Sequence, residues 1–253
     1  MKIIPLCEGA FTIGKTKEFI PFNLVQDDLQ QRATGSLLVE IQPFVIVTSK
    51  DIILMDTGLG LTGRNDILQI HENLAANNLS SHDITKVLLS HLHKDHSGGV
   101  SKKDKVLSKS FLSFPNATYY VNRQEMEMAI SKGLPSYTLD DFTILNDSAN
   151  VIFTEGDGTI DNYIQYLVSG AHTPFHQVFW VTENDEKIFF GGDVAPQLQQ
   201  MKNRFVAKYD YDGKKAMELR QQWWKEGEKE NWTFLFYHDI KQPVFDFHKK
   251  GLP

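Results

Sequence analysis

Short apolar runs recur along the chain, and they predict its strands. They are rich in β-branched and aromatic side chains and are followed by turn residues, which is typical of strands. We predict strands near 36–49 and at 51–56, 86–90, 118–121, 151–154, 164–169, 177–182, 187–190 and 233–237. The sequence TENDE at 182–186 predicts a hairpin turn between two of them.

Two segments have the three- and four-residue spacing of apolar positions that is typical of amphipathic helices. The first is 65–78, with apolar positions at Ile67, Ile70, Leu74 and Ala75 and an N-cap at Asn65 or Asp66. The second is 214–230, whose apolar face carries Ala216, Leu219 and Trp223. Segment 136–150 has no clear period, and we predict a loop or a cap over a site there. Together the patterns indicate an α/β fold with mixed strand connectivity.

The sequence gives no sign of a division into separate units. It has no repeat of fixed period, no low-complexity tract and no linker rich in Pro, Gly or Ser. A chain of this length can bury a large core as one domain. We therefore expect one domain over residues 1–253, with an N-terminal extension over about residues 1–35.

Composition and charge narrow the classes of function. The net charge is −6 with 23% charged residues, and the basic residues are scattered, which argues against nucleic acid as a partner. The basic cluster at 101–110 is interpreted as a solvated loop. No apolar run approaches the ~18 residues of a membrane span and no signal peptide is evident, so we expect a cytoplasmic protein without membrane contact. The lone Cys7 excludes an internal disulfide, and any metal must be held by nitrogen and oxygen.

The segment SHLHKDHSGG at 90–99 concentrates imidazole and carboxylate groups. Within six consecutive positions lie His91, His93, Asp95 and His96. Because alternate residues of an extended segment point to the same side, the first two histidines can share one cation. Burying these groups as an ordinary core would be costly unless each found a hydrogen-bond partner. The motif therefore predicts a metal site at the end of the strand 86–90.

Three further candidates follow other predicted strands. They are His172 after 164–169, Asp193 after 187–190 and His238 after 233–237. The ends of strands are where open α/β sheets usually gather ligands. Four ligands in the first loop could complete one structural metal site, and the three later candidates favour two metal ions instead.

The loop HLHKDH, followed by GAHTPFH, GGD and a final HD, resembles the metallo-β-lactamase superfamily of dinuclear hydrolases. The likeness spans roughly residues 36 to 240. It implies an αββα sandwich of two mixed β-sheets flanked by helices. Carried over by position, it implies that a first ion is held by His91, His93 and His172, and a second by Asp95, His96 and His238. Asp193 would bridge the two ions.

Four further positions, outside the proposed ligands, also bear on the resemblance. The DTG element at 56–58 implies that Asp56 supports a ligand histidine, with a turn or helix cap as the alternative interpretation. His176 matches a second, structural histidine of the family pattern, and Phe175 replaces a glycine beside it. Pro196 stands where lactone-opening relatives have a tyrosine hydroxyl donor, so that contribution is absent unless Tyr209 or Tyr237 replaces it.

Two bridged cations would lower the pKa of a shared water, so that hydroxide is available near neutral pH. Asp95 could exchange a proton with the reacting groups, which makes Asp95 and Asp193 the catalytic candidates. The ligands suit zinc and would also accept manganese, iron or cobalt.

Segments 19–36 and 209–224 are most similar to the lactonase and methyl-parathion-hydrolase-like branch. We therefore expect a hydrolase of small esters, lactones or aryl phosphoesters, whose partner is a small-molecule substrate. The alternatives are an iron-dependent oxidoreductase of the persulfide dioxygenase kind, a nucleic-acid-processing member of the superfamily, and a non-enzymatic binding protein. The oligomeric state stays open, with a homodimer as one candidate. The aromatic residues Phe19, Phe22, Phe175 and Trp180 are assigned to the core rather than to a substrate pocket.

Overall fold

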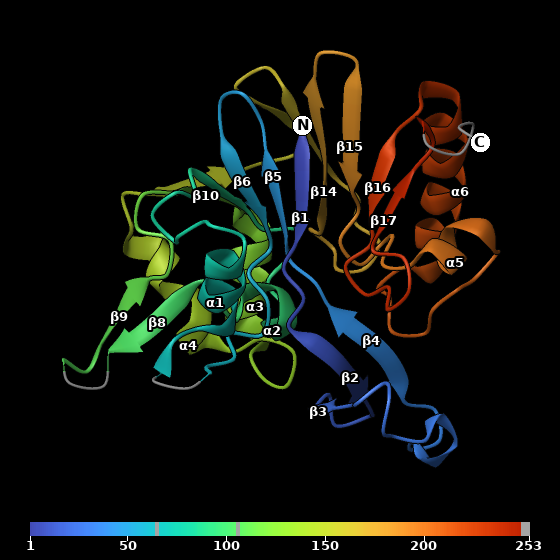
Figure 1. Ribbon diagram of the computed structural model, residues 1–253, viewed down its shortest axis with the longest axis horizontal. Helices are drawn as coiled ribbons and strands as arrows, with labels where there is room; N and C mark the ends of the chain where they lie inside the picture. Colours follow the sequence, from blue (N-terminus) through green and yellow to red (C-terminus); the bar gives the residue numbers. More distant parts are fainter. Residues whose placement is uncertain (64–65, 105–106, 249–253) are drawn as a thin grey trace.

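Two mixed β-sheets form the centre of the protein in a computed structural model that describes residues 1–253 apart from 64–65, 105–106 and 249–253 (Figure 1). The first has the order β1-β5-β6-β7-β10-β11. Its strands are β1 Lys2–Pro5, β5 Phe44–Val47, β6 Ile52–Met55, β7 Lys86–Leu88, β10 Thr118–Asn122 and β11 Val151–Thr154. The pairs from β1 to β6 are antiparallel, and those from β6 to β11 are parallel.

The second sheet has the order β12-β13-β14-β15-β16-β17. Its strands are β12 Gly158–Ile160, β13 Ile164–Val168, β14 Gln177–Glu183, β15 Glu186–Phe190, β16 Thr233–Leu235 and β17 Val244–Asp246. Only the β15–β16 pair is parallel among these neighbours. The predicted hairpin turn at 182–186 connects β14 to β15, with Asn184 in the left-handed region at φ 52°.

Helices cover the outer faces of both sheets. On the first sheet lie α1 Gln69–Ala76, α3 Arg123–Lys132, α4 Leu139–Phe142 and the 3-10 helix η3 Thr143–Asp147, while the single turn α2 Lys94–Ser97 lies in the loop after β7. On the second lie α5 Leu198–Lys202 and α6 Gly213–Glu230. None of the helices in the described part of the chain is long and apolar enough to cross a bilayer.

Three buried apolar layers hold this arrangement together. The middle layer packs the two sheets face to face and includes Phe44 and Met55 of the first sheet and Phe179 and Phe190 of the second. One outer layer joins α1 and α3 to the first sheet, and the other joins α5 and α6 to the second. Burial of this surface is the main driving force for folding. The αββα sandwich expected from the resemblance is confirmed.

Two small sheets extend the sandwich. One has the order β3-β2-β4, with β2 Gly9–Ile13, β3 Phe19–Pro21 and β4 Leu37–Ile41, and a 3-10 helix η1 Leu29–Gln31 lies between β3 and β4. The other is the hairpin of β8 Ser101–Asp104 and β9 Lys109–Leu112. The prediction of a solvated loop at 101–110 was therefore wrong in its secondary structure. It rested on the charged composition of the segment, which does not distinguish a loop from strands that pair at an exposed position.

Local predictions also needed correction at two element boundaries. The run 36–49 forms two strands, β4 and β5, which belong to different sheets. The strand pattern is interrupted at Pro43, which cannot donate a backbone hydrogen bond. Helix α1 begins at Gln69, after a bridge between Thr62 and Leu68, so Asp66 is not its N-cap. Asn65 lies outside the described residues. Segment 136–150 forms α4 and η3, which bury Phe142 and Leu145 in the core.

Candidate metal centre

The loop after β7 is shaped by close contact with the turn at 57–59. One turn of helix, α2, begins directly after His93. A Cβ on Gly98 would lie 2.3 Å from the Leu59 carbonyl carbon, and one on Gly99 would lie 2.2 Å from the Thr57 carbonyl oxygen. Only glycine permits these approaches. The pair therefore presses the loop of the histidine motif against the DTG element.

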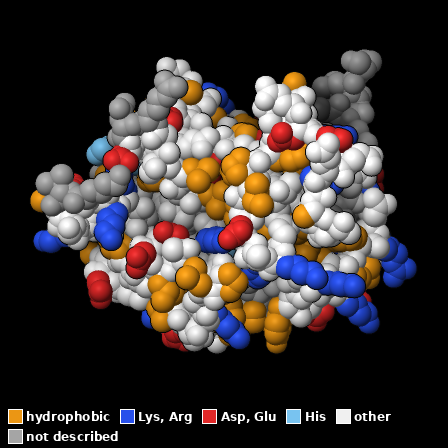
Figure 2. Space-filling view, turned by 90° about the horizontal axis from the view of Figure 1, so that it is seen from below, with side chains coloured by type: hydrophobic (Ala, Val, Ile, Leu, Met, Phe, Trp, Pro, Cys, Tyr) orange, Lys and Arg blue, Asp and Glu red, His pale blue; other side chains and the backbone are white. Residues whose placement is uncertain are grey.

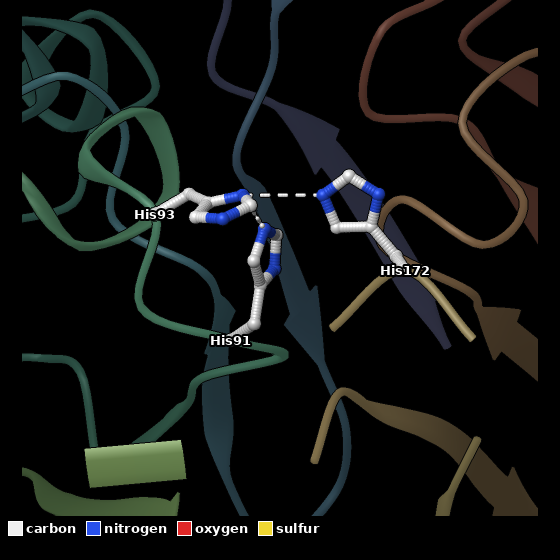
Figure 3. Close-up of side chains that lie close together, drawn as sticks. All are labelled: His91, His93 and His172. Carbon is white, nitrogen blue, oxygen red and sulfur yellow. Dashed lines mark hydrogen bonds between the residues drawn. The ribbon is translucent and has the colours of Figure 1, made fainter. Parts of the chain in front are cut away.

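Three imidazoles converge from two loops. The Nδ1 atom of His93 lies 2.9 Å from Nε2 of His91 and 3.1 Å from Nε2 of His172 (Figure 3). His91 is fully buried, and His172 is 7% exposed. The structure thus brings together the three histidines that the resemblance assigns to a first ion.

The hydrogen bonds behind these rings fix where their lone pairs point. The Nδ1 atom of His172 lies 2.8 Å from Oδ1 of Asp210, so it carries the hydrogen. Ser90 donates its hydroxyl hydrogen to Asp56 at 2.7 Å, which leaves its oxygen to accept from Nδ1 of His91 at 3.0 Å. In the neutral rings of His91 and His172, Nε2 then carries a lone pair and no hydrogen. Nδ1 of His93 can donate a hydrogen to only one of these two nitrogens. A cation satisfies all three nitrogens.

A second group lies beside the first. The Nε2 atoms of His96 and His238 each lie 3.1 Å from Oδ1 of Asp193 and 3.6 Å from Oδ2 of Asp95. The Nδ1 atom of His96 is 2.7 Å from Oδ2 of Asp56, and that of His238 is 2.7 Å from the Glu40 carbonyl oxygen. Both partners can only accept, so the Nε2 lone pairs again point into the group.

Asp193 lies between the two groups. Its Oδ1 faces His96 and His238, and its Oδ2 lies 3.3 Å from Nε2 of His172. Within the described residues, Oδ1 of Asp193 and Nε2 of His96 are buried without a hydrogen-bond partner. Buried polar atoms are rarely left in this state. The two groups of donors fit a pair of divalent cations with a carboxylate between them.

Charges within the site shift the pKa values of its groups in opposite directions. Burial and the neighbouring imidazoles lower the pKa of His91 and His93 well below the usual value. Burial also opposes a charge on His96, but the carboxylates of Asp193, Asp95 and Asp56 outweigh it and raise that pKa well above the usual value. A cation at the second group would therefore compete with a proton for Nε2 of His96.

Asp56 and His176 support the site without lining the cavity. Asp56 is fully buried at φ 56° and accepts from the Ser90 amide and hydroxyl and from His96. This contact agrees with the supporting role predicted for Asp56 rather than with a turn cap. His176 accepts a hydrogen bond at Nε2 from the Asp193 amide at 3.2 Å, so it positions that carboxylate.

Two acidic residues at the site were not identified from the sequence. Asp210 holds His172 across 38 positions of chain. Glu125 of α3 is fully buried, accepts from the Leu92 amide at 3.2 Å and the Thr173 hydroxyl at 2.7 Å, and thereby joins both histidine loops. Burial raises its pKa to about 7. Neither residue has a local signal, because an acidic residue in a helix or a turn is usually exposed.

A cavity of about 490 Å³ opens over the two groups. His93, Asp95, His172, Asp193 and His238 form part of its lining. Tyr209 and Pro196 lie at its wall, and the three-stranded small sheet β3-β2-β4 contributes Phe19. Phe19 also packs against the middle apolar layer, so it belongs both to the core, as predicted, and to the cavity wall. Trp180 is in the core as predicted, and Tyr237 is buried with its hydroxyl donating to the Asp95 carbonyl at 2.6 Å.

Comparison with known proteins places this arrangement among related folds. The family model described as "Metallo-beta-lactamase superfamily" matches residues 40–238. The lactamase-like protein notP of Aspergillus sp. (strain MF297-2) is 28% identical over 154 residues, which are 60% of this chain and 37% of that protein. The chain thus spans well under half the length of this curated relative.

Solved structures share the fold at low sequence identity. A probable metal-dependent hydrolase from Staphylococcus aureus has a TM-score of 0.78 and 20% identity, over 97% of this chain and 92% of that one. AidC, a dizinc quorum-quenching lactonase in complex with a product, has a TM-score of 0.67 and 21% identity, over 96% and 88%. The hydrolase AbOPH has a TM-score of 0.73 and 23% identity, over 96% and 89%.

Proposed function

The chain belongs to the metallo-beta-lactamase superfamily, and from that premise we propose that it is a metal-dependent hydrolase of small ester, lactone or aryl phosphoester substrates. The observation that carries the proposal is the position of Asp193, whose two oxygens face two converging groups of imidazole lone pairs. A single-ion site would not need both groups. The cavity above them has the size of a small-molecule site.

We assign the ligands as the geometry groups them. His91, His93 and His172 would hold one ion, Asp95, His96 and His238 the other, and Asp193 both. Zinc suits these nitrogen and oxygen donors, as in the dizinc lactonase AidC, although manganese, iron and cobalt are also compatible. When bound, such ions supply a water activated near neutral pH and stabilise negative charge on a substrate.

The side chains around the ions orient the ligands and handle a proton. Asp56 and Asp210 hold the Nδ1 hydrogens of His96 and His172, which keeps the opposite nitrogens free. Asp95 turns Oδ2 towards His96 and His238 and lines the cavity. We therefore assign its Oδ1 to accept the proton that the hydrolytic water loses and to return it to the leaving group.

Tyr209 brings a hydroxyl to the cavity wall beside His172. Pro196 has no side-chain donor, and the hydroxyl of Tyr237 is already engaged by the Asp95 carbonyl. The ring of Tyr209 lies 6.0 Å from that of His172 at the cavity wall. We therefore assign Tyr209 as the donor to the carbonyl or phosphoryl oxygen that becomes negative during reaction.

A substrate panel tests the proposed function. The metal-loaded protein is assayed on aryl esters, lactones and aryl phosphotriesters, with Asp193→Ala as the matched control. We expect hydrolysis of at least one class, lost on chelation and restored by the metal. Full metal loading without hydrolysis of any class would overturn the proposal. A single iron per chain with turnover of a persulfide would instead support the oxidoreductase alternative.

A further inference from the structure

The cavity over the metal centre is lined by apolar side chains and by lysines. The small sheet β3-β2-β4 contributes an apolar wall that includes Ile13 of β2, Phe19 of β3 and Leu37 and Val39 of β4. Strand β2 pairs with both β3 and β4, so these side chains are held by a hydrogen-bonded ladder rather than by a free loop. This wall suits the hydrocarbon part of a substrate.

Lysines from three separate segments line the same cavity. Lys15 and Lys17 come from the turn between β2 and β3, Lys94 begins α2, and Lys208 precedes α6. Figure 2 views the molecule from the side of the small sheet and shows Lys and Arg side chains among hydrophobic and acidic ones. Residues this far apart in sequence meet here only because of the fold.

Two of these lysines are anchored at the cavity. Lys17 donates from Nζ to the Ser136 hydroxyl at 2.6 Å, and Nζ of Lys94 lies 5.5 Å from the centre of the Phe19 ring. Within the described residues, none of the four cavity lysines forms an ion pair with a carboxylate. Their charges therefore stay available to a bound molecule.

The surrounding charge makes this arrangement unusual for the chain. The whole protein has a net charge of −6, so a generally basic surface does not explain four lysines around one cavity. The acidic residues of the lining are Asp95 and Asp193, and both face the imidazoles of the metal centre. Clefts lined by one sign of charge concentrate ligands of the opposite sign.

We propose that the substrate carries, besides its scissile ester or lactone, a separate anionic group that the cavity lysines bind, while its apolar part lies on the small sheet. This inference rests on the proposed hydrolase function and narrows its substrate class. A carboxylate and a phosphate share the required chemistry, since the Lys ammonium is a point charge that pairs with either. Neutral acyl lactones lack this group.

A matched set of aryl esters tests the proposal. The metal-loaded protein is assayed on 4-nitrophenyl hexanoate, on mono-4-nitrophenyl adipate, which adds a terminal carboxylate, and on the corresponding ester with a terminal phosphate. At low salt we expect kcat/KM to be about tenfold higher for at least one anionic ester than for the neutral one. The better of the two anionic esters identifies the preferred group. Because salt screens such charges, the advantage should shrink as ionic strength rises.

Variants then locate the effect. Lys17→Met combined with Lys208→Met should lower the ratio of anionic to neutral kcat/KM by about tenfold, at roughly 2- to 5-fold for each partly exposed charge pair. Lys225→Met, on an exposed part of α6 outside the cavity lining, is the matched control and should leave the ratio unchanged.

The outcomes separate this inference from the proposed function. Equal rates on the neutral and anionic esters, with a ratio that the double variant does not change, would overturn the anionic subsite while leaving the hydrolase intact. Absence of hydrolysis for all three esters and for the broader panel would instead overturn the hydrolase itself.

Discussion

Replacing Asp56 with asparagine tests how the chain fixes the tautomer of His96. The carboxylate accepts three hydrogen bonds, each of 2.7 Å, from the Ser90 amide, the Ser90 hydroxyl and Nδ1 of His96. Asparagine has nearly the same shape and tolerates the left-handed backbone at φ 56°. The substitution therefore changes the hydrogen-bonding pattern with little change in packing.

The amide of Asn has one acceptor and one donor end. Because the Ser90 amide must keep an acceptor, the new NH₂ group would face Nδ1 of His96 and force that nitrogen to accept. The ring hydrogen then moves to Nε2, the atom that points towards Asp193 at 3.1 Å. The opposite amide orientation would leave the Ser90 amide unsatisfied, at a cost of about 1–3 kcal/mol.

We expect Asp56→Asn to weaken metal binding by about 10- to 100-fold, the usual effect of losing such a supporting carboxylate. That change corresponds to about 1.4–2.7 kcal/mol. Asp210→Asn is the matched variant for the first group, because Asp210 holds Nδ1 of His172 at 2.8 Å. The assay is elemental analysis after equilibration with graded chelator, with the circular dichroism spectrum as the control for folding.

Double variants show which ion each substitution affects. Asp56→Asn combined with His172→Ala should lose both ions. The new NH₂ group also faces the Ser90 hydroxyl that accepts from Nδ1 of His91, so Asp56→Asn combined with His238→Ala should hold the first ion less tightly than His238→Ala alone. Wild-type affinity for both ions in a folded Asp56→Asn protein would refute the reasoning about the His96 tautomer.

Three further predictions follow from the same geometry. His91→Ala or His172→Ala should lower bound metal and abolish hydrolysis together, and normal metal content and rate in these variants would contradict the assignment. Asp193→Ala should lose more metal than either, because the oxygens of Asp193 face both groups. Tyr209→Phe should lower kcat by ~10²–10³ on lactones and less on activated aryl esters, and equal losses on both would argue against an oxyanion donor. Metal affinity should fall as the pH drops below the raised pKa of His96, because that imidazole must release its proton on binding; calorimetric titration in buffers of different ionisation enthalpy measures that proton, and an affinity independent of pH would contradict it.

The candidate ligands of the metal centre could be predicted from the sequence, because they stand in short motifs or directly after predicted strands. His91 and His93 could be paired from their spacing, and the later candidates His172, Asp193 and His238 from their positions after strands, and the structure does bring these residues together. The three- and four-residue spacing of apolar positions in 214–230 likewise predicted the bounds of α6 almost correctly. Asp212 caps the start of this helix, and Asn231 ends it in the left-handed region.

Features that depend on tertiary contact were beyond sequence reasoning. Asp210 and Glu125 acquire their roles only where the fold brings them to the histidine loops. The predicted N-terminal extension contributes β1 to the first sheet, paired with β5, and β2 and β3 to the cavity wall. Its short strands are interrupted by turns, so no periodic pattern marked them. Pro43, by contrast, was a visible break in the run 36–49 that the apolar pattern obscured.

The number of metal ions bound per chain tests the central claim most directly. Purified protein is stripped with chelator and titrated with zinc, while bound metal is measured by elemental analysis and hydrolysis by a chromogenic ester from the panel. We predict that two ions bind per chain and that hydrolysis returns as both sites fill. Saturation at one ion per chain, with Asp193→Ala binding the same amount, would contradict a dinuclear hydrolytic centre.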